Sequence, residues 1–187
     1  MRSITVIVFA LMCGATVALV APGGALADLL KAGDMAPQFS TGAIYGEQTT
    51  PIKLSDYRGQ IVALYCYPKD FTPGCTTEAC TFRDSYAKIK KAGIVLLGCS
   101  VDTADSHRAF IKKYGLPFPL LLDPDKKIAT EYGVANGIAK YDLDGRVTYV
   151  IGGDGRILKV YPKVDPALNA SEIISQFGSG KSTAVAN

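Results

Sequence analysis

The sequence predicts an α/β fold in which helices cover both faces of a mixed sheet. Three observations lead to this prediction. Short apolar runs rich in β-branched residues alternate with longer helical segments, glycine and proline separate the two kinds of segment, and about 160 residues follow an apolar amino-terminal stretch. That length suits one domain that buries a hydrophobic core.

The first expected strand is residues 61–67, a short apolar run with β-branched and aromatic side chains. Pro68 to Gly74 contains the breakers that end it. A helix is expected over about Pro73 to Lys91. A proline is tolerated in the first turn, where its missing N–H would be unpaired anyway, and Gly93 lies near the expected end.

The rest of the chain continues this alternation. Further strands are expected at 94–101, 119–122, 146–151 and 156–161, and further helices at about 104–114, 125–132 and 169–177. Asp142, Asp144 and Asp154, with the glycines beside them, are interpreted as hairpin turns.

Residues 1–27 are expected to be a signal peptide cleaved after Ala27. Arg2 precedes an apolar run over 4–20, and Ala25 and Ala27 supply the small side chains that a signal peptidase reads. A retained membrane anchor is the alternative, although the apolar run is just short of a usual span. The domain then covers 28–177, residues 178–187 are expected to be disordered, and the mature protein is expected outside the cytosol, most simply in a bacterial periplasm.

Charge and composition exclude several other classes of function. The formal charge of +3 falls to +2 without Arg2, which is too small to suggest nucleic acid or an anionic membrane surface as a partner. After the leader, no segment has the apolar length to span a bilayer. One histidine and no C-x-x-C pair give a zinc site little support, so His107 is interpreted as a capping or packing residue at a helix start.

Cys75 is the most informative residue, because it falls in the first turn of the expected helix, directly after a strand. There, unpaired backbone N–H groups and the positive end of the helix dipole favour a thiolate, which is the nucleophilic form of cysteine. A buried structural cysteine is the alternative interpretation. The position indicates a redox site.

Pro68, Thr72 and Cys75 match the P-x-x-x-T-x-x-C motif of peroxiredoxins, and the surrounding segment resembles the peroxiredoxin Q branch, also called bacterioferritin comigratory protein. Further similar segments are 33–39, 54–59, 98–102, 106–110 and 146–151, the last matching the strand that carries the family's active-site arginine. The resemblance covers residues 31–177. It implies a thioredoxin-like fold and a peroxidase for hydrogen peroxide or small alkyl hydroperoxides, recycled by a thioredoxin-like protein without metal, haem or flavin.

Attack of a thiolate on a peroxide develops negative charge on the leaving oxygen, so the site needs hydrogen-bond donors and a nearby positive charge. The Thr72 hydroxyl, the Cys75 backbone N–H and the Arg146 guanidinium are the expected donors, and Pro68 would exclude water sterically. Taken singly, Thr72 could be a helix cap, Pro68 a strand terminator and Arg146 a solvated charge. Glu78 either orients Arg146 or the backbone, or is a first-turn acid that suits the helix dipole.

The product of the attack would be a sulfenic acid on Cys75, which condenses with a nearby thiol, and Cys80 is the expected resolving residue. Five residues of ideal helix rise about 7.5 Å, beyond the roughly 7 Å that a disulfide spans between Cα atoms. Oxidation should therefore unwind the first one or two turns after Gly74. The resemblance implies the same intramolecular pairing, which removes one reason to dimerise, so a monomer is expected.

The other cysteines are interpreted as bystanders: Cys66 and Cys99 as small buried hydrophobes, and Cys13 as part of the leader. A second class of function stays open. It is an exported thiol–disulfide oxidoreductase, or a non-catalytic domain with a structural Cys75–Cys80 disulfide, which an oxidising compartment permits. A thioredoxin-type oxidoreductase would use C-x-x-C, and a structural disulfide would not need Thr72 and Arg146.

Overall fold

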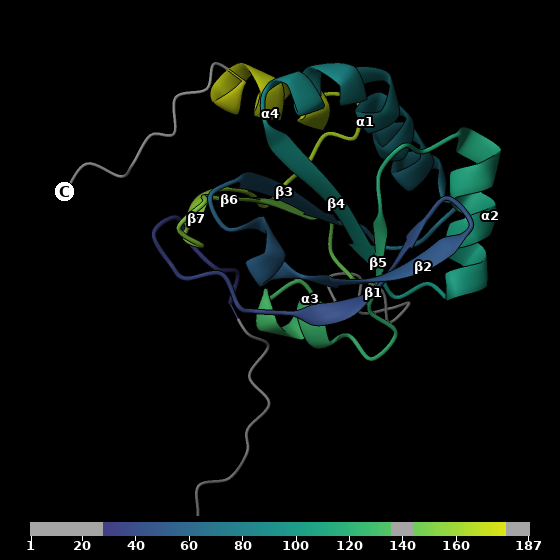
Figure 1. Ribbon diagram of the computed structural model, residues 1–187, viewed down its shortest axis with the longest axis horizontal. Helices are drawn as coiled ribbons and strands as arrows, with labels where there is room; N and C mark the ends of the chain where they lie inside the picture. Colours follow the sequence, from purple (N-terminus) through teal and green to yellow (C-terminus); the bar gives the residue numbers. More distant parts are fainter. Residues whose placement is uncertain (1–27, 136–143, 179–187) are drawn as a thin grey trace, which may run out of the picture.

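A seven-stranded mixed sheet is the centre of the computed structural model, which describes residues 28–135 and 144–178 (Figure 1). Its strand order is β2-β1-β5-β4-β3-β6-β7. The β3–β4 and β4–β5 pairs are parallel, and the remaining pairs are antiparallel. The strands are β1 Ser40–Tyr45, β2 Gln48–Lys53, β3 Ile61–Cys66, β4 Ile94–Ser100, β5 Leu120–Leu122, β6 Val147–Ile151 and β7 Ile157–Tyr161.

Helices lie on both sides of this sheet, as the sequence predicts. They are the 3-10 helix η1 Leu54–Tyr57 and the α-helices α1 Pro73–Lys91, α2 Ala104–Tyr114, α3 Lys127–Glu131 and α4 Asn169–Phe177. In Figure 1, α1 and α4 lie side by side above the sheet, α3 lies below it, and α2 stands beside β1 and β2. The predicted mixed sheet flanked by helices is confirmed.

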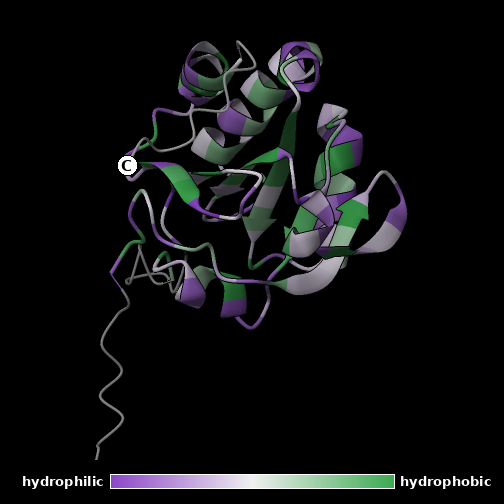
Figure 2. Cartoon of the chain, turned by 60° about the vertical axis from the view of Figure 1, so that its left-hand side comes forward, coloured by the Kyte–Doolittle hydropathy of each residue, from purple (hydrophilic) through white to green (hydrophobic). Residues whose placement is uncertain are grey.

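Strand β3 explains why the sheet is buried on both faces. Its alternate residues Val62 and Leu64 belong to the hydrophobic cluster that includes Ile128 of α3. Ala63 and Tyr65 belong to a second cluster formed with α1, α2 and α4. Successive side chains of a strand point to opposite faces, so one apolar run serves two cores. Figure 2 shows the most hydrophobic colouring on the central strands, whereas the helices carry both colours.

Helix α1 has the predicted bounds. Its buried residues follow helical spacing, so one face packs on the sheet: they are Cys75, Glu78, Ala79, Phe82 and Ile89. Pro73 occupies the first helical position, and Gly93 beyond the helix end has a φ of +72°, a conformation that glycine adopts without a Cβ clash.

The other expected elements are present, with bounds shifted by at most two residues, but the hairpin of β1 and β2 was missed. β2 lies at the edge of the sheet, contains Pro51 and buries only Ile52, so its sequence lacks the alternation typical of a strand. Asp154 lies in the β6–β7 turn as predicted. Asp144 is buried, 1% exposed, and borders residues 136–143, which lie outside the described residues together with Asp142, so a hairpin turn at Asp142 and Asp144 stays a prediction.

The predicted leader, residues 1–27, also lies outside the described residues, as does the predicted disordered tail from residue 179 onward. Within 28–135 and 144–178, none of the helices combines the length and apolarity needed to cross a bilayer.

Candidate active site

Cys75 lies where the chain leaves the central strand β3 and enters α1. Thr72 is the residue before the helix and Pro73 its first residue, so Cys75 belongs to the first turn. Its side chain is buried, 1% exposed. A backbone N–H in this turn has no acceptor within the helix, and the helix dipole is positive here. The fold therefore directs partial positive charge at the Cys75 sulfur.

Arg146 comes from the neighbouring strand. β6 pairs antiparallel with β3, and Cys66 at the end of β3 lies opposite Val147 at the start of β6. Arg146 precedes Val147 and lies just outside the strand rather than in it, which corrects the predicted strand start. Its Nη2 donates to Cys75 Sγ at 3.1 Å. Burial disfavours its charge, but Glu78 and Cys75 outweigh burial, and the pKa of Arg146 is raised.

Glu78 holds the other end of the guanidinium. It lies three residues after Cys75 on the same helix, its side chain is completely buried, and its Oε2 accepts a hydrogen bond from Arg146 Nη1. Its Oε1 has no hydrogen-bond partner among the described residues. Burial raises the pKa of Glu78 to about 7, although Arg146 acts in the opposite direction. Glu78 and Cys75 thus hold Arg146 between them.

Gly74 leaves the space that this guanidinium needs. A Cβ built on Gly74 would lie 3.1 Å from Arg146 Nη2, which is tighter than an ordinary van der Waals contact. A side chain at this position would push the guanidinium away from Cys75.

Thr72 and Pro68 lie in the same loop, but among the described residues neither makes a hydrogen bond to the Cys75 sulfur, whereas Arg146 does. The Thr72 hydroxyl donates to the Lys69 carbonyl oxygen at 3.0 Å, and the side chain makes no capping hydrogen bond to the helix. Pro68 is buried directly after β3. Of the five residues predicted for the site, the structure brings Cys75 and Arg146 into contact. Glu78 pairs with Arg146, which agrees with the predicted orienting role rather than with that of a first-turn acid.

A family model described as the AhpC/TSA family matches residues 32–160. The chain belongs to the AhpC/TSA family. It is 41% identical over 151 residues to the "Putative peroxiredoxin bcp" of Coxiella burnetii, an alignment that covers 79% of this chain and 98% of that protein. It is 48% identical over 115 residues to the chloroplastic peroxiredoxin Q of Sedum lineare, which covers 62% of this chain but only 61% of that protein.

The solved structures agree with the sequence relatives. A cysteine-to-serine mutant of PrxQ from Xylella fastidiosa superposes with a TM-score of 0.73 at 28% identity, covering 80% of this chain and 96% of that chain. The predicted peroxiredoxin family of the Q and Bcp type, and with it the class of oxidoreductase, is confirmed, as is the thioredoxin-like fold.

Cys80 is the resolving residue predicted for this peroxiredoxin. It lies in α1, partly exposed, and it is a free thiol, as are Cys66, Cys75 and Cys99. Since α1 is continuous from Pro73 to Lys91, Cys75 and Cys80 lie five positions apart along one helix, with both thiols free. Pairing of these two cysteines, with the unwinding that it requires, stays a prediction.

Cys66 and Cys99 lie directly opposite each other on the parallel strands β3 and β4, and both are buried. A hydrogen bond with Cys66, together with burial, raises the pKa of Cys99 well above its ordinary value. Cys99 is therefore protonated at neutral pH, and a protonated thiol is a poor nucleophile.

Sequence reasoning missed a buried polar cluster below the loop that leads to Cys75. Asp70 of this loop contacts His107 of α2, with 2.9 Å between Asp70 Oδ2 and His107 Nδ1. The interpretation of His107 as a capping residue is wrong, because Thr103 caps α2 by accepting from the Ser106 N–H; its interpretation as a packed residue is confirmed. No local pattern in the sequence indicates that Asp70 and His107, which are 37 positions apart, are in contact. The one signal that could have drawn attention to His107 is that the single histidine lies in a segment that resembles the family.

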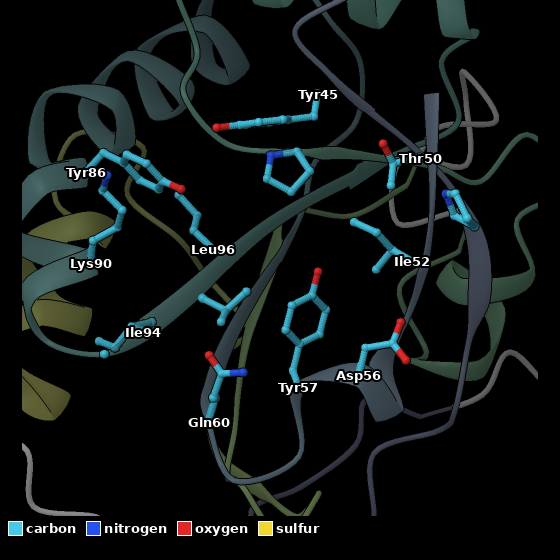
Figure 3. A pocket seen from close by; sticks show the side chains of 14 residues that line it. Tyr45, Thr50, Ile52, Asp56, Tyr57, Gln60, Tyr86, Lys90, Ile94 and Leu96 are labelled. Carbon is cyan, nitrogen blue, oxygen red and sulfur yellow. The ribbon is translucent and has the colours of Figure 1, made fainter. Parts of the chain in front are cut away.

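A hollow of about 590 Å³ lies elsewhere on the molecule (Figure 3). Tyr45, Tyr57 and Tyr86 line it together with Ile94 and Leu96 from the first half of β4. β3 and β4 are parallel and in register, so this hollow lies at the amino ends of the strands, whereas Cys75 follows the carboxyl end of β3. The hollow is not part of the candidate active site.

Proposed function

We propose that the protein is a thiol-dependent peroxidase that reduces hydrogen peroxide and small alkyl hydroperoxides at Cys75. The observation that carries this proposal is the buried Cys75 sulfur in hydrogen-bond contact with Arg146 Nη2, at 3.1 Å, in the first turn of a helix. This arrangement favours a thiolate and keeps a fixed positive charge beside it. The peroxiredoxin names of the relatives support the same chemistry.

In the first step, the Cys75 thiolate attacks one peroxide oxygen, forming an S–O bond while the O–O bond breaks. Cys75 becomes a sulfenic acid, and the departing oxygen takes a proton from water and leaves as water or alcohol. Arg146 and the Cys75 backbone N–H are placed to stabilise the charge on the departing oxygen. The Thr72 hydroxyl joins them if it exchanges its hydrogen bond to Lys69 for one to the peroxide.

In the second step, the Cys80 sulfur displaces hydroxide from the sulfenic acid, and water is released as the Cys75–Cys80 disulfide forms. A dithiol protein of the thioredoxin kind then supplies two electrons and two protons to restore both thiols. No metal, haem or flavin takes part in these steps. The two sulfurs belong to one chain, so a monomer can complete the cycle.

The amino-terminal sequence supports an exported enzyme. The apolar run after Arg2 and the Ala25-Leu26-Ala27 site favour cleavage by signal peptidase, and a bacterial periplasm is the proposed location. The electron donor must then act outside the cytosol.

The alternative is an exported thiol–disulfide oxidoreductase or a non-catalytic domain with a structural Cys75–Cys80 disulfide. Burying the Glu78–Arg146 pair costs desolvation energy, and a structural disulfide does not require a guanidinium in contact with the sulfur. The geometry therefore favours the peroxidase.

The mass and the free thiols of the protein, before and after one equivalent of hydrogen peroxide, test this proposal. Wild type should lose two thiols rapidly, and Cys80→Ser should gain about 16 Da on Cys75 at a similar rate, the mass of one oxygen. The control is Cys75→Ser, which should lose no thiol rapidly. Slow oxidation of wild type, with a pre-existing disulfide that resists reduction, would support the structural alternative instead.

A further inference from the structure

The loop between β3 and α1 is held from below by a polar network that includes no residue of the site described above. Asp70 lies in the middle of this loop, with its side chain completely buried. Its Oδ1 accepts from the Tyr67 hydroxyl at 2.8 Å, and its Oδ2 accepts from the Ser106 hydroxyl at 2.7 Å. Its backbone N–H donates to Asp102 Oδ2 at 2.8 Å. Both the backbone and the side chain of Asp70 are therefore fixed.

His107 completes this network and is also fully buried. Its Nδ1 lies 2.9 Å from Asp70 Oδ2, and its Nε2 lies 3.2 Å from the Leu121 carbonyl oxygen. A backbone carbonyl can only accept, and so can an ionised carboxylate, whereas a neutral imidazole carries a single N–H. If Asp70 is ionised, both contacts of His107 can be hydrogen bonds only when His107 carries a proton on each ring nitrogen.

The partners of the Asp70 carboxylate act as hydrogen-bond donors. Tyr67 donates to Oδ1 and Ser106 donates to Oδ2, in addition to the contact with His107, so both oxygens act as acceptors. Tyr67 stays a donor, because burial and the neighbouring Asp70 raise its pKa well above its ordinary value. Asp102, the other acid facing this cluster, immediately precedes Thr103, the N-cap of α2, and its Oδ2 accepts from the Asp70 N–H.

The residue after Asp70 shows why the loop needs such support. Phe71 has a φ of +62°, a left-handed conformation that a bulky side chain disfavours. Its ring packs edge-on against Phe110 at 5.1 Å between centroids and lies 6.3 Å from Tyr114. One face of α2 thus contacts two consecutive loop residues, by hydrogen bonds at Asp70 and by aromatic packing at Phe71. Two residues later α1 begins, and Cys75 is in its first turn.

Asp70, Asp102 and His107 are also close enough to ligate a metal ion. However, His107 Nδ1 bonds directly to Asp70, and Asp102 Oδ2 already accepts from Ser100 and from the Asp70 N–H. An ion would have to break these bonds, so the network is better explained as it stands.

We propose that His107 is a positioning residue of the peroxidase: as an imidazolium it pairs with Asp70, sets the shape of the loop from Pro68 to Thr72 and so places Cys75 beside Arg146. This inference rests on the proposed function, because the effect is expected on the reaction with peroxide. His107 lies in α2 and contacts none of Cys75, Arg146 and Glu78 through a hydrogen bond recorded among the described residues.

The protonation state can be observed directly. The chain has a single histidine, so ¹⁵N–¹H NMR of tag-free reduced protein reports on His107 alone. If both nitrogens donate as proposed, both should show the signals of an imidazolium. A neutral tautomer would overturn the charge assignment.

The positioning role is tested with His107→Gln, Asp70→Asn and the double variant. For each protein, the Cys75 rate constants with hydrogen peroxide and with iodoacetamide are measured. Iodoacetamide needs a thiolate but not the geometry that stabilises a departing oxygen. Each single variant should lose about 10- to 100-fold in the peroxide rate, as misplacement by about 1 Å does. The loss with iodoacetamide should be clearly smaller, because iodoacetamide reports only the fraction of Cys75 that is thiolate. The double variant should be no slower than either single variant, because it leaves no unpaired buried charge.

A pH profile separates positioning from a general structural role. The ratio of the peroxide rate to the iodoacetamide rate should fall in wild type at the pH where NMR shows His107 losing its second proton, and His107→Gln should lack that fall. A ratio that does not change with His107 protonation, or that is the same in wild type and the single variants, would overturn the proposal. If a single variant does not fold, the pH profile of wild type and the rates of the double variant still test the positioning role of His107.

Tyr132→Phe is the matched control. It removes a partly buried hydrogen bond, from the Tyr132 hydroxyl to the Pro37 carbonyl oxygen at 2.9 Å, and Tyr132 lies in the cluster on the opposite face of the sheet. Its ratio of rates should equal that of wild type. If wild type itself reacts with peroxide no faster than free cysteine, the proposed function fails; if wild type is fast and the single variants equal it, only this inference fails.

Discussion

Replacing Arg146 by glutamine removes the partner of a buried carboxylate, and it should make the stability of the protein fall more steeply as the pH rises. Glu78 is completely buried and its hydrogen bond from Arg146 is the one recorded for its carboxylate, whereas Arg146 is 18% exposed. Loss of the guanidinium leaves Glu78 two options: to stay ionised without a partner, or to take up a proton.

The magnitude follows from the pKa of Glu78. Burial raises it from 4.5 to about 7 in the folded protein, so folding favours the protonated acid. The corresponding stability is fully present below pH 4.5 and is lost as the pH rises through about 7, in total about 3 kcal/mol. Arg146 lowers the pKa of Glu78, so its removal raises that pKa further. The variant should therefore continue to lose about 1.4 kcal/mol per pH unit above pH 7, where wild type has levelled off.

Urea unfolding of reduced protein at pH 5, 7 and 9 measures this effect. The difference in unfolding free energy between wild type and Arg146→Gln should be smallest at pH 5 and should grow by about 3 kcal/mol between pH 7 and pH 9. Glu78→Gln supplies the control, because in that background only the Cys75 thiolate still depends on Arg146, so the cost of Arg146→Gln should grow much less with pH.

A wild-type-to-variant difference that is equal at pH 5 and pH 9 would refute the reasoning. So would a difference that grows by the same amount in the Glu78→Gln background, because the titrating group would then be another residue, such as Cys75. Arg146→Gln should also slow the reaction with peroxide, with or without Glu78→Gln, because the contact between Arg146 and the Cys75 sulfur is lost.

Three further predictions follow from the site. Oxidation should abolish hydrogen-exchange protection of the amides from Cys75 to Phe82 and reduction should restore it; equal protection in both states would contradict the required unwinding. Gly74→Ala should slow the peroxide reaction several-fold, because the new methyl would lie 3.1 Å from Arg146 Nη2 and displace the guanidinium from Cys75. Stopped-flow kinetics of the folded variant measure this rate, and an unchanged rate would contradict the prediction. Thr72→Val should lose about tenfold or more in the same assay, whereas Thr72→Ser, which keeps the hydroxyl, should lie within a few-fold of wild type.

Much of the fold could be predicted because the relevant signals are local. The apolar run of β3 is buried on both faces, and Pro73 and Gly93 mark the ends of α1, so each was visible in a short window of sequence. The β1–β2 hairpin was not, because an edge strand that buries only Ile52 is stabilised by its neighbour rather than by its own pattern.

The candidate site divides in the same way. The motif placed Cys75 in the first turn of a helix, and the resemblance pointed to Arg146, but the contact between them depends on how β6 pairs with β3. The deep burial of Glu78, which raises its pKa to about 7, depends on α1 packing on the sheet and could not be inferred from a first-turn acid.

By itself, the sequence determined the order of the principal strands and helices and the position of Cys75 in the first turn of α1, because residue spacing and helix-breaking residues act over a few positions. Only the tertiary structure decided which distant groups meet. It joined Arg146 to Cys75 through strand pairing, and it placed the single histidine under Asp70 through the packing of α2 on the loop. Such contacts link residues 71 and 37 positions apart, and they arise from the shared burial of several elements, which no local pattern encodes.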